Sequence, residues 1–345
     1  MVTIQMRTSI RTIASLLGLF FLLGIFLAVG LGYYLVSPAE RGAEQQVFVV
    51  REGATLKEVA IELERNTLIK NDRFLLIWAR LMGYGKDIKA GEYHLSAGMP
   101  PVKILSTLRM GAIVTHPVTI PEGFTIEQIG VLLGKKELVN SDEFISLAKD
   151  PKTAEDYGIP GKGLEGYLYP DTYHFGRGLS AQSIIDTMIR RFHQMVDPLG
   201  NRAGEIGMKM EDVVILASII EKETGRGEER PMIASVFLNR IKKKMRLESD
   251  PTVIYGIENF SGNIKRKDLN RPSPYNTYLL RGLPAGPIAN PGLESIKAVL
   301  YPDQTDYLYF VSKNDGTHYF SKTLAEHNKA VLIYQKRKRS RKKPR

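Results

Sequence analysis

The chain has 345 residues, of which 43% are hydrophobic and 25% are charged, so it is a globular protein rather than a disordered one. It has no cysteine, which excludes disulfides, zinc–thiolate sites and thiol nucleophiles. The net charge of +11 arises mostly from the last ten residues, Lys336 to Arg345, which hold eight Lys or Arg and no acid. The rest of the chain carries only +3, so its charge does not indicate a nucleic-acid-binding body.

Residues 13–36 are an apolar run of 24 residues, longer than the roughly 20 needed to cross a bilayer. Two arginines precede the run, and Tyr33 and Tyr34 mark its far edge as interfacial aromatics. The positive-inside rule then places residues 1–12 in the cytoplasm and everything after the run outside. We expect a single-pass anchor in the cytoplasmic (inner) membrane. A signal peptide cleaved near Ala39 is the alternative.

Residues 47–150 repeat themselves at an offset of 70 residues. Glu52-Gly-Ala-Thr-Leu-Lys-Glu-Val-Ala60 is echoed by Glu122-Gly-Phe-Thr-Ile-Glu-Gln-Ile-Gly130. Each copy predicts a strand, a glycine turn, a threonine N-cap and an amphipathic helix. This duplicated α+β region is either a packing unit without a ligand or a carbohydrate-binding module similar to LysM domains, which also place a Gly-x-Thr turn before a helix.

Residues 155–334 predict a second α+β domain, followed by a basic tail at 335–345. Its pattern indicates irregular loops at 247–256 and 282–292, the second rich in Gly and Pro, and rigid loops of this kind often line a site. The periodicity predicts five helices, at 180–196, 211–224, 230–241, 294–300 and 324–334. It also predicts a closing hairpin whose two strands are 307–312 and 317–320.

The helix 211–224 ends near Glu221, which lies on its buried face together with Val214, Ala217 and Ser218. Burial and the negative end of the helix dipole both disfavour a charged carboxylate, so we expect Glu221 to be protonated and able to act as a general acid. The alternative interpretation is that Glu221 pairs with a neighbouring Lys or Arg.

A typical glycoside hydrolase uses two opposed carboxylates, but no second carboxylate is placed beside Glu221 by spacing. Glu223 lies about 200° around the same helix, and Asp250 is followed by a proline in a predicted loop. The six histidines lack any metal-binding spacing, so no metal or other cofactor is predicted. The stretch 163–175 is dense in aromatics and hydroxyls, which suits either a glycan cleft or an aromatic core.

Five sequence blocks, in this order, carry a resemblance. They are Ala217-Ser-Ile-Ile-Glu-Lys-Glu-Thr224, Ala234-Ser-Val-Phe-Leu-Asn-Arg240, Ser249-Asp-Pro-Thr252, Tyr275-Asn-Thr-Tyr278 and Gly282-Leu-Pro-Ala-Gly-Pro-Ile288. With the anchor and the Glu-Gly-x-Thr repeat, they resemble the YceG-like family of endolytic murein transglycosylases over nearly the whole chain. The basic tail departs from that pattern.

The resemblance implies an α+β fold with a single transmembrane helix, a LysM-like module and a catalytic domain built around the helix that carries the catalytic glutamate, which falls on Glu221. It implies cleavage inside peptidoglycan strands, between N-acetylmuramic acid and N-acetylglucosamine. In the mechanism we expect, Glu221 protonates the glycosidic oxygen and then deprotonates the muramyl C6 hydroxyl, which closes a 1,6-anhydro ring, so neither water nor a second carboxylate is needed.

The expected partners are peptidoglycan glycan strands, the cytoplasmic membrane and peptidoglycan synthases, with no nucleic acid, and the family implies a role in terminating nascent strands. The rival interpretation is a non-enzymatic, membrane-anchored scaffold that binds peptidoglycan. Ten residues are candidates for holding the glycan, each of which could equally be structural: Glu165, Tyr167, Tyr169, Thr172, Ser218, Asp250, Thr252, Tyr255, Asn276 and Tyr278.

Overall fold

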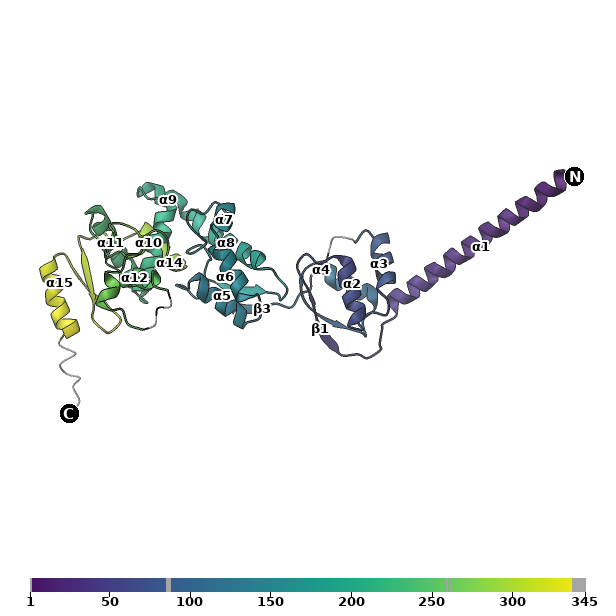
Figure 1. The fold of residues 1–345 in the computed structure, drawn as a ribbon, viewed down its shortest axis with the longest axis horizontal. Coiled ribbons are helices and arrows are strands. Elements are labelled where there is room, and N and C mark those ends of the chain that lie inside the picture. The colour runs from purple at the N-terminus through teal and green to yellow at the C-terminus, as the bar shows by residue number, and fades with distance from the viewer. Residues whose placement is uncertain (1, 85–87, 259, 261, 337–345) are drawn as a thin grey trace, which may run out of the picture. The chain divides into compact units, whose positions relative to one another are not determined.

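A computed structural model describes residues 2–84, 88–258, 260 and 262–336 (Figure 1). Nearly all of the basic tail predicted at 335–345 lies outside the described residues. The backbone divides into two compact units. The first unit holds residues 1–116 and 175–179, and the second unit holds residues 117–174 and 180–345. Both mix helices with short strands, which confirms the predicted α+β class.

The first unit begins with α1 (Val2–Val36), which starts before the apolar run predicted at 13–36. Within it, Leu16–Val36 is the one segment of the described chain long and apolar enough to span a membrane. The rest of the unit comprises β1 (Gln45–Val50), α2 (Leu56–Arg65), α3 (Asp72–Leu81), β2 (Gly91–Ser96) and α4 (Pro101–Met110).

Strands β1 and β2 form an antiparallel pair in which Gln45 lies opposite Ser96 and Val50 opposite Gly91. One face of this pair and the apolar sides of α2, α3 and α4 close the core of the first unit, in which Tyr93 and Leu63 are fully buried. Burial of such side chains is the main favourable term for a small α+β unit.

The second unit holds most of the helices. Its elements are α5 (Ile126–Lys135), α6 (Ser141–Lys149), α7 (Pro151–Asp156), β4 (Thr172–Phe175), α8 (Ala181–Val196), α9 (Gly200–Glu205), α10 (Met210–Glu223), α11 (Arg230–Lys242), α12 (Asp250–Tyr255), α13 (Arg266–Leu269), α14 (Leu293–Leu300), β5 (Tyr309–Ser312), β6 (His318–Ser321) and α15 (Leu324–Val331). Strand β4 pairs with β3 (His116–Thr119), and β5 pairs antiparallel with β6, as the hairpin pattern predicted.

The two copies of the sequence repeat fold as expected. Thr55 caps α2 and Thr125 caps α5, and each forms a capping box with the residue three positions later, Glu58 or Gln128. The copies fall in different units, the first at 45–81 and the second at 116–149. The predicted region 47–150 therefore contributes to both units.

Helix α10 lies at the centre of the second unit, where it packs against α11 and α14. Its eight residues from 213 to 220 are all buried. One local prediction is wrong: residues 250–255, expected in a loop, form α12. Pro251 lies in the first turn of this helix, where a missing N–H costs nothing, so the proline starts the helix rather than breaking it.

Candidate active site

The Glu221 carboxylate, in the last turn of α10, is held by three donors from elsewhere in the second unit. Arg230 Nη2 lies 3.0 Å from Oε1, while the Gly292 amide and the Ser295 hydroxyl donate to Oε2 over 3.0 and 2.7 Å. The side chain is 6% exposed. The ion pair expected under the alternative interpretation is therefore present, and these donors suit an ionised carboxylate.

Arg230 is shared with a second carboxylate. The same Nη2 lies 3.4 Å from Glu122 Oε2, and the Glu122 side chain is 47% exposed whereas that of Arg230 is 11% exposed. The Glu122 carboxylate also lies against Gly292, where a Cβ would come within 1.9 Å of its Oε1. Arg230 Nε is buried and has no acceptor among the described residues, so the guanidinium retains an unused donor. Glu122 is thus a second carboxylate beside Glu221.

Glu223 faces the opposite side of α10, as its position around the helix predicted. Its carboxylate accepts a hydrogen bond from Ser249, and burial followed by the charge of Asp250 raises its pKa to about 7. It contacts none of the groups that hold Glu221 in the described structure. The two glutamates of α10 therefore belong to different surroundings.

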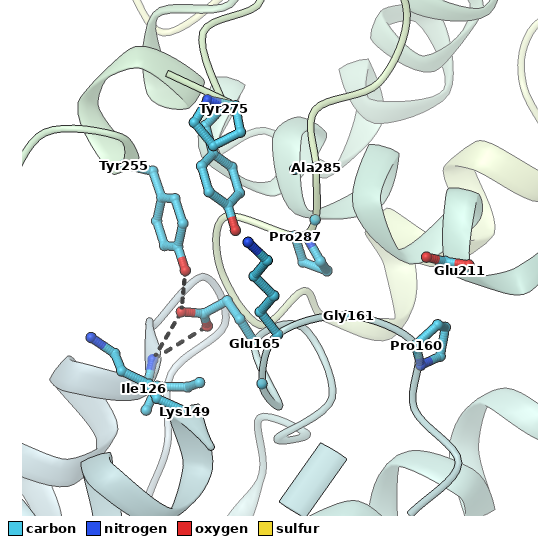
Figure 2. A pocket seen from close by; sticks show the side chains of 14 residues that line it. Ile126, Lys149, Pro160, Gly161, Glu165, Glu211, Tyr255, Tyr275, Ala285 and Pro287 are labelled. Carbon is cyan, nitrogen blue, oxygen red and sulfur yellow. Dashed lines mark hydrogen bonds between the residues drawn. The ribbon is translucent and has the colours of Figure 1, made fainter. Parts of the chain in front are cut away.

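The second unit also has a cavity of about 320 Å³ with Glu165 in its wall, and neither Glu221 nor its three donors are among the lining residues (Figure 2). Tyr255 and Tyr275 form one side, their rings packed edge to face 4.8 Å apart. The rest of the lining comes from Ile126, Lys149, Glu211, Pro274 and the Gly- and Pro-rich segments 160–163 and 285–287. Aromatic walls with a few convergent polar groups are usual in ligand sites, including those for sugars.

The Glu165 carboxylate accepts hydrogen bonds from three donors. The Ile126 amide, at the start of α5, lies 3.2 Å from Oε1, and the Tyr255 hydroxyl lies 3.1 Å from Oε2. Asn290 Nδ2 donates to Oε1 over 2.9 Å. The pKa of Glu165 is nevertheless raised to about 8, chiefly by burial and next by the charge of Glu127. Burial also raises the pKa of the Tyr255 hydroxyl.

Asn290 connects the cavity to Glu221. Its side-chain oxygen accepts from the amides of Gly166 and Leu168, and its nitrogen donates to the Phe124 carbonyl and to Glu165, all at 2.9 Å. Every hydrogen-bonding group of this buried amide is satisfied. Two residues later, Gly292 donates to Glu221, so one short loop fixes both carboxylates.

Only two of the ten residues predicted to hold a glycan, Glu165 and Tyr255, line the cavity. Exposed Asp250 and half-buried Tyr278 form a separate pair, with the Tyr278 hydroxyl 2.7 Å from the Asp250 carboxylate. Thr172 is exposed on β4, where its hydroxyl meets that of Thr119.

The other five predicted residues are buried and have structural contacts. Tyr167 packs on Phe192, and the Tyr169 carbonyl accepts from Tyr173. Ser218, Thr252 and Asn276 are fully buried, and their hydrogen bonds fix neighbouring loops: Ser218 holds the Ile288 amide, Thr252 meets Thr277, and Asn276 donates to the carbonyls of Leu269 and Arg271.

Sequence reasoning missed Arg230, Glu122 and Ser295 at the carboxylate, and Lys149 and Tyr275 at the cavity. A signal existed for two of them. Glu122 opens the second copy of the repeat, and Tyr275 belongs to the block 275–278. Ser295 offered no such signal, because it reaches Glu221 from 74 residues away.

Among the described residues, no three His, Asp or Glu side chains are grouped so as to hold a metal ion. The site is a buried carboxylate on an α+β scaffold, of the kind that performs acid–base chemistry. The chain belongs to the YceG-like family, whose sequence model matches residues 48–332.

Named relatives agree with this membership. An endolytic murein transglycosylase of Bacillus subtilis is 36% identical over 320 residues, covering 88% of this chain and 89% of the relative. One of Streptococcus pneumoniae is 29% identical over 337 residues, covering 88% of this chain but only 61% of the relative. A crystal structure of a YceG-like protein from Listeria monocytogenes has a TM-score of 0.59 and 34% identity, covering 84% of this chain and 100% of that chain.

Proposed function

We propose that this protein is an endolytic lytic transglycosylase that cleaves the bond between N-acetylmuramic acid and N-acetylglucosamine within peptidoglycan strands and leaves 1,6-anhydro-muramyl ends. Two endolytic murein transglycosylases match 88% of the chain, which supports the reaction. The observation that carries the choice of Glu221 is its place, a buried carboxylate at the end of α10 held by three donors, one from α11 and two from the start of α14.

In the proposed reaction, protonated Glu221 gives its proton to the glycosidic oxygen as the bond to muramyl C1 breaks. The resulting cation is oxocarbenium-like or is trapped by the neighbouring acetamido group. The Glu221 carboxylate then takes the proton of the C6 hydroxyl as that oxygen bonds to C1, so protons balance and no water is consumed. The nucleophile belongs to the substrate, and its proximity replaces a second catalytic carboxylate.

The three donors around Glu221 suit a carboxylate, the form that the second step requires. For the first step the carboxylate must be protonated, so Arg230 must release Oε1. Glu122 provides the alternative partner, because it already lies 3.4 Å from the same nitrogen. We assign Arg230 and Glu122 as positioning residues that act through Glu221.

The remaining parts of the proposal concern place and substrate contacts. The segment Leu16–Val36 supports a single-pass membrane anchor, with the N-terminus in the cytoplasm and the chain after Val36 outside. The cavity at Glu165 would hold a sugar of the strand against Tyr255 and Tyr275. The LysM-like role of the repeat, the termination of nascent strands and the contact with synthases stay predictions.

The test is mass spectrometry of the muropeptides released from purified peptidoglycan by the detergent-solubilised chain and by Glu221→Gln. We expect anhydro-muramyl ends from the wild type and a loss of at least about 100-fold in the variant. Glu223→Gln, the same change on the other side of α10, is the matched control and should still cleave. Reducing ends would establish a hydrolase instead. Binding without cleavage by any protein would establish the scaffold.

A further inference from the structure

Helix α3 presents an apolar face that the first unit leaves uncovered. Leu75 and Ala79 point into the core, whereas Phe74, Ile77 and Leu81 are 43%, 48% and 68% exposed. The three exposed residues follow one another at helical spacing and therefore share one face of α3. A contiguous apolar face on a water-exposed helix is unusual unless it has a partner.

In the second copy of the repeat, the corresponding phenylalanine is covered by neighbouring elements. Phe144 on α6 occupies the position that Phe74 has on α3, and it is completely buried. In the second unit α8 packs on α6, while the helices packed on α3 are α2 and α1. The matched phenylalanine is therefore buried in the second unit but 43% exposed in the first.

The end of α1 indicates what covers this face. The Tyr34 hydroxyl donates to the carbonyl of Asn71, the N-cap residue of α3, and the Tyr34 and Phe74 rings lie 5.2 Å apart. Leu35 is 5% exposed. Figure 1 shows α3 beside this end of α1. Tyr34 and Leu35 belong to the last turn of the apolar segment Leu16–Val36.

The length of that segment sets the height of α3 relative to a bilayer. Its 21 residues span about 32 Å as a helix, close to the roughly 30 Å of a hydrocarbon core. A helix packed on its last turn therefore lies at the boundary between acyl chains and head groups. Tyrosine is typical of that boundary.

The charges of α3 complement an anionic surface. Arg73 and Arg80 are exposed and line a shallow hollow together with Leu76, Ile77 and Leu81. Asp72, in the first turn, is the single acid in the helix. Arginines beside an apolar face extend their charged ends to head groups while their stems stay in apolar surroundings.

We propose that α3 lies in the outer interfacial layer of the membrane, with Phe74, Ile77 and Leu81 among the acyl chains and Arg73 and Arg80 at anionic head groups. This proposal rests on the anchor in the proposed function. It gives the protein a second membrane contact, which fixes the orientation of the first unit as well as its attachment.

The test uses the full chain in phosphatidylcholine vesicles in which about 30% of the lipid is phosphatidylglycerol, which gives the vesicles a negative surface. Because the chain has no cysteine, single variants Ile77→Cys, Phe26→Cys and Ser146→Cys each accept one environment-sensitive fluorophore. Phe26 lies in α1, and Ser146 is exposed on α6, the matched helix of the second unit. Quenching by nitroxide-labelled lipids then reports contact with the bilayer.

We expect strong quenching at Phe26 by deep nitroxides, strong quenching at Ile77 by shallow nitroxides, and little at Ser146. Replacing both arginines, in Arg73→Gln/Arg80→Gln, should reduce the quenching at Ile77 at least twofold and leave Phe26 unchanged. Trp78, the single tryptophan and part of α3, provides a check without a label, through quenching by brominated lipids.

Two results would overturn the proposal and are distinguishable. Quenching at Phe26 with Ile77 no more quenched than Ser146 would leave the anchor intact and place α3 in water. No quenching at Phe26 would remove the anchor itself, and the placement of α3 with it. Cleavage of peptidoglycan by the same samples would separate either result from a failure of the proposed reaction.

Discussion

At the scale of single residues, the guanidinium of Arg230 is shared between the carboxylates of Glu221 and Glu122. Arg230 from α11, Glu122 from the turn before α5, and the Gly292 amide and Ser295 hydroxyl at α14 face the carboxylate. The neighbouring Lys222 is directed to the Gly123 carbonyl. Arg230 is thus the one cation in direct contact with Glu221 among the described residues.

Arg230→Gln should therefore move the falling limb of the pH–kcat profile to higher pH, because Glu221 must be protonated for the first step and has lost the cation that favours its ionised form. Glu122→Gln should move the same limb to lower pH, because Arg230 is then left to Glu221 alone. Arg230→Lys should restore much of the original profile. Equal loss of kcat at every pH in all three variants would mean that the residues only support the fold.

Glu165 predicts a pH dependence of stability. Its pKa is raised from 4.5 to about 8 in the folded state, so the folded chain holds a proton that the unfolded chain has lost between these values. The free energy of unfolding should fall as pH rises from about 4.5 to about 8, by up to about 1.4 kcal/mol per pH unit for this group.

Urea unfolding of the second unit at several pH values would measure this slope. Glu165→Gln should flatten it, and Glu223→Gln should flatten only the part below about pH 7, since the Glu223 pKa is raised to about 7. An unchanged slope in Glu165→Gln would show that the carboxyl stays ionised in the folded chain.

At the scale of elements, the two capping boxes are alike in sequence, but we expect only the one at α5 to affect glycan cleavage. Thr55→Ala and Thr125→Ala should each cost about 1 kcal/mol of stability, because each removes the hydroxyl that accepts the amide of the third helical residue. Thr125 precedes Ile126, whose amide donates to Glu165. Loss of the Thr125 hydroxyl should therefore also slow glycan cleavage.

Cleavage assays on the two variants, beside thermal unfolding, would test this difference. Thr55→Ala should keep full activity at temperatures where it is folded. If both variants lost activity equally, the cap of α5 would have no special role at the cavity.

The local elements could be predicted from the sequence because their signals are local. Threonine N-caps, the glycine turns and the helical period of 211–224 all lie within a few residues of the structure that they determine. The prediction of a loop at 250–255 was wrong because an Asp-Pro pair can begin either a loop or a helix. The surroundings of Glu221 could not be predicted, since their donors come from 9, 71 and 74 residues further along the chain.

At the scale of the whole molecule, the two compact units predict two unfolding events. Leu63 and Leu133 occupy matching positions of the repeat, one in each unit, and both are fully buried. Leu63→Ala should destabilise the first unit by about 2–5 kcal/mol and Leu133→Ala the second by a similar amount. Calorimetry should show two unfolding transitions, and each variant should lower the midpoint temperature of a different one. If both variants lowered the midpoint of one shared transition, the two units would unfold together.

The hydrogen bonds of Asn290 have a consequence for the order of biosynthesis. Asn290 reaches back 166 residues to the Phe124 carbonyl, and two residues later Gly292 supplies a donor to Glu221. The ribosome adds Gly292 71 residues after Glu221, and contacts between such distant residues form slowly. Until Gly292 and Ser295 have been made, the Glu221 carboxylate of the nascent chain therefore lacks two of its three donors. A truncated chain that ends before α14 should fold its first unit and leave the cell wall untouched.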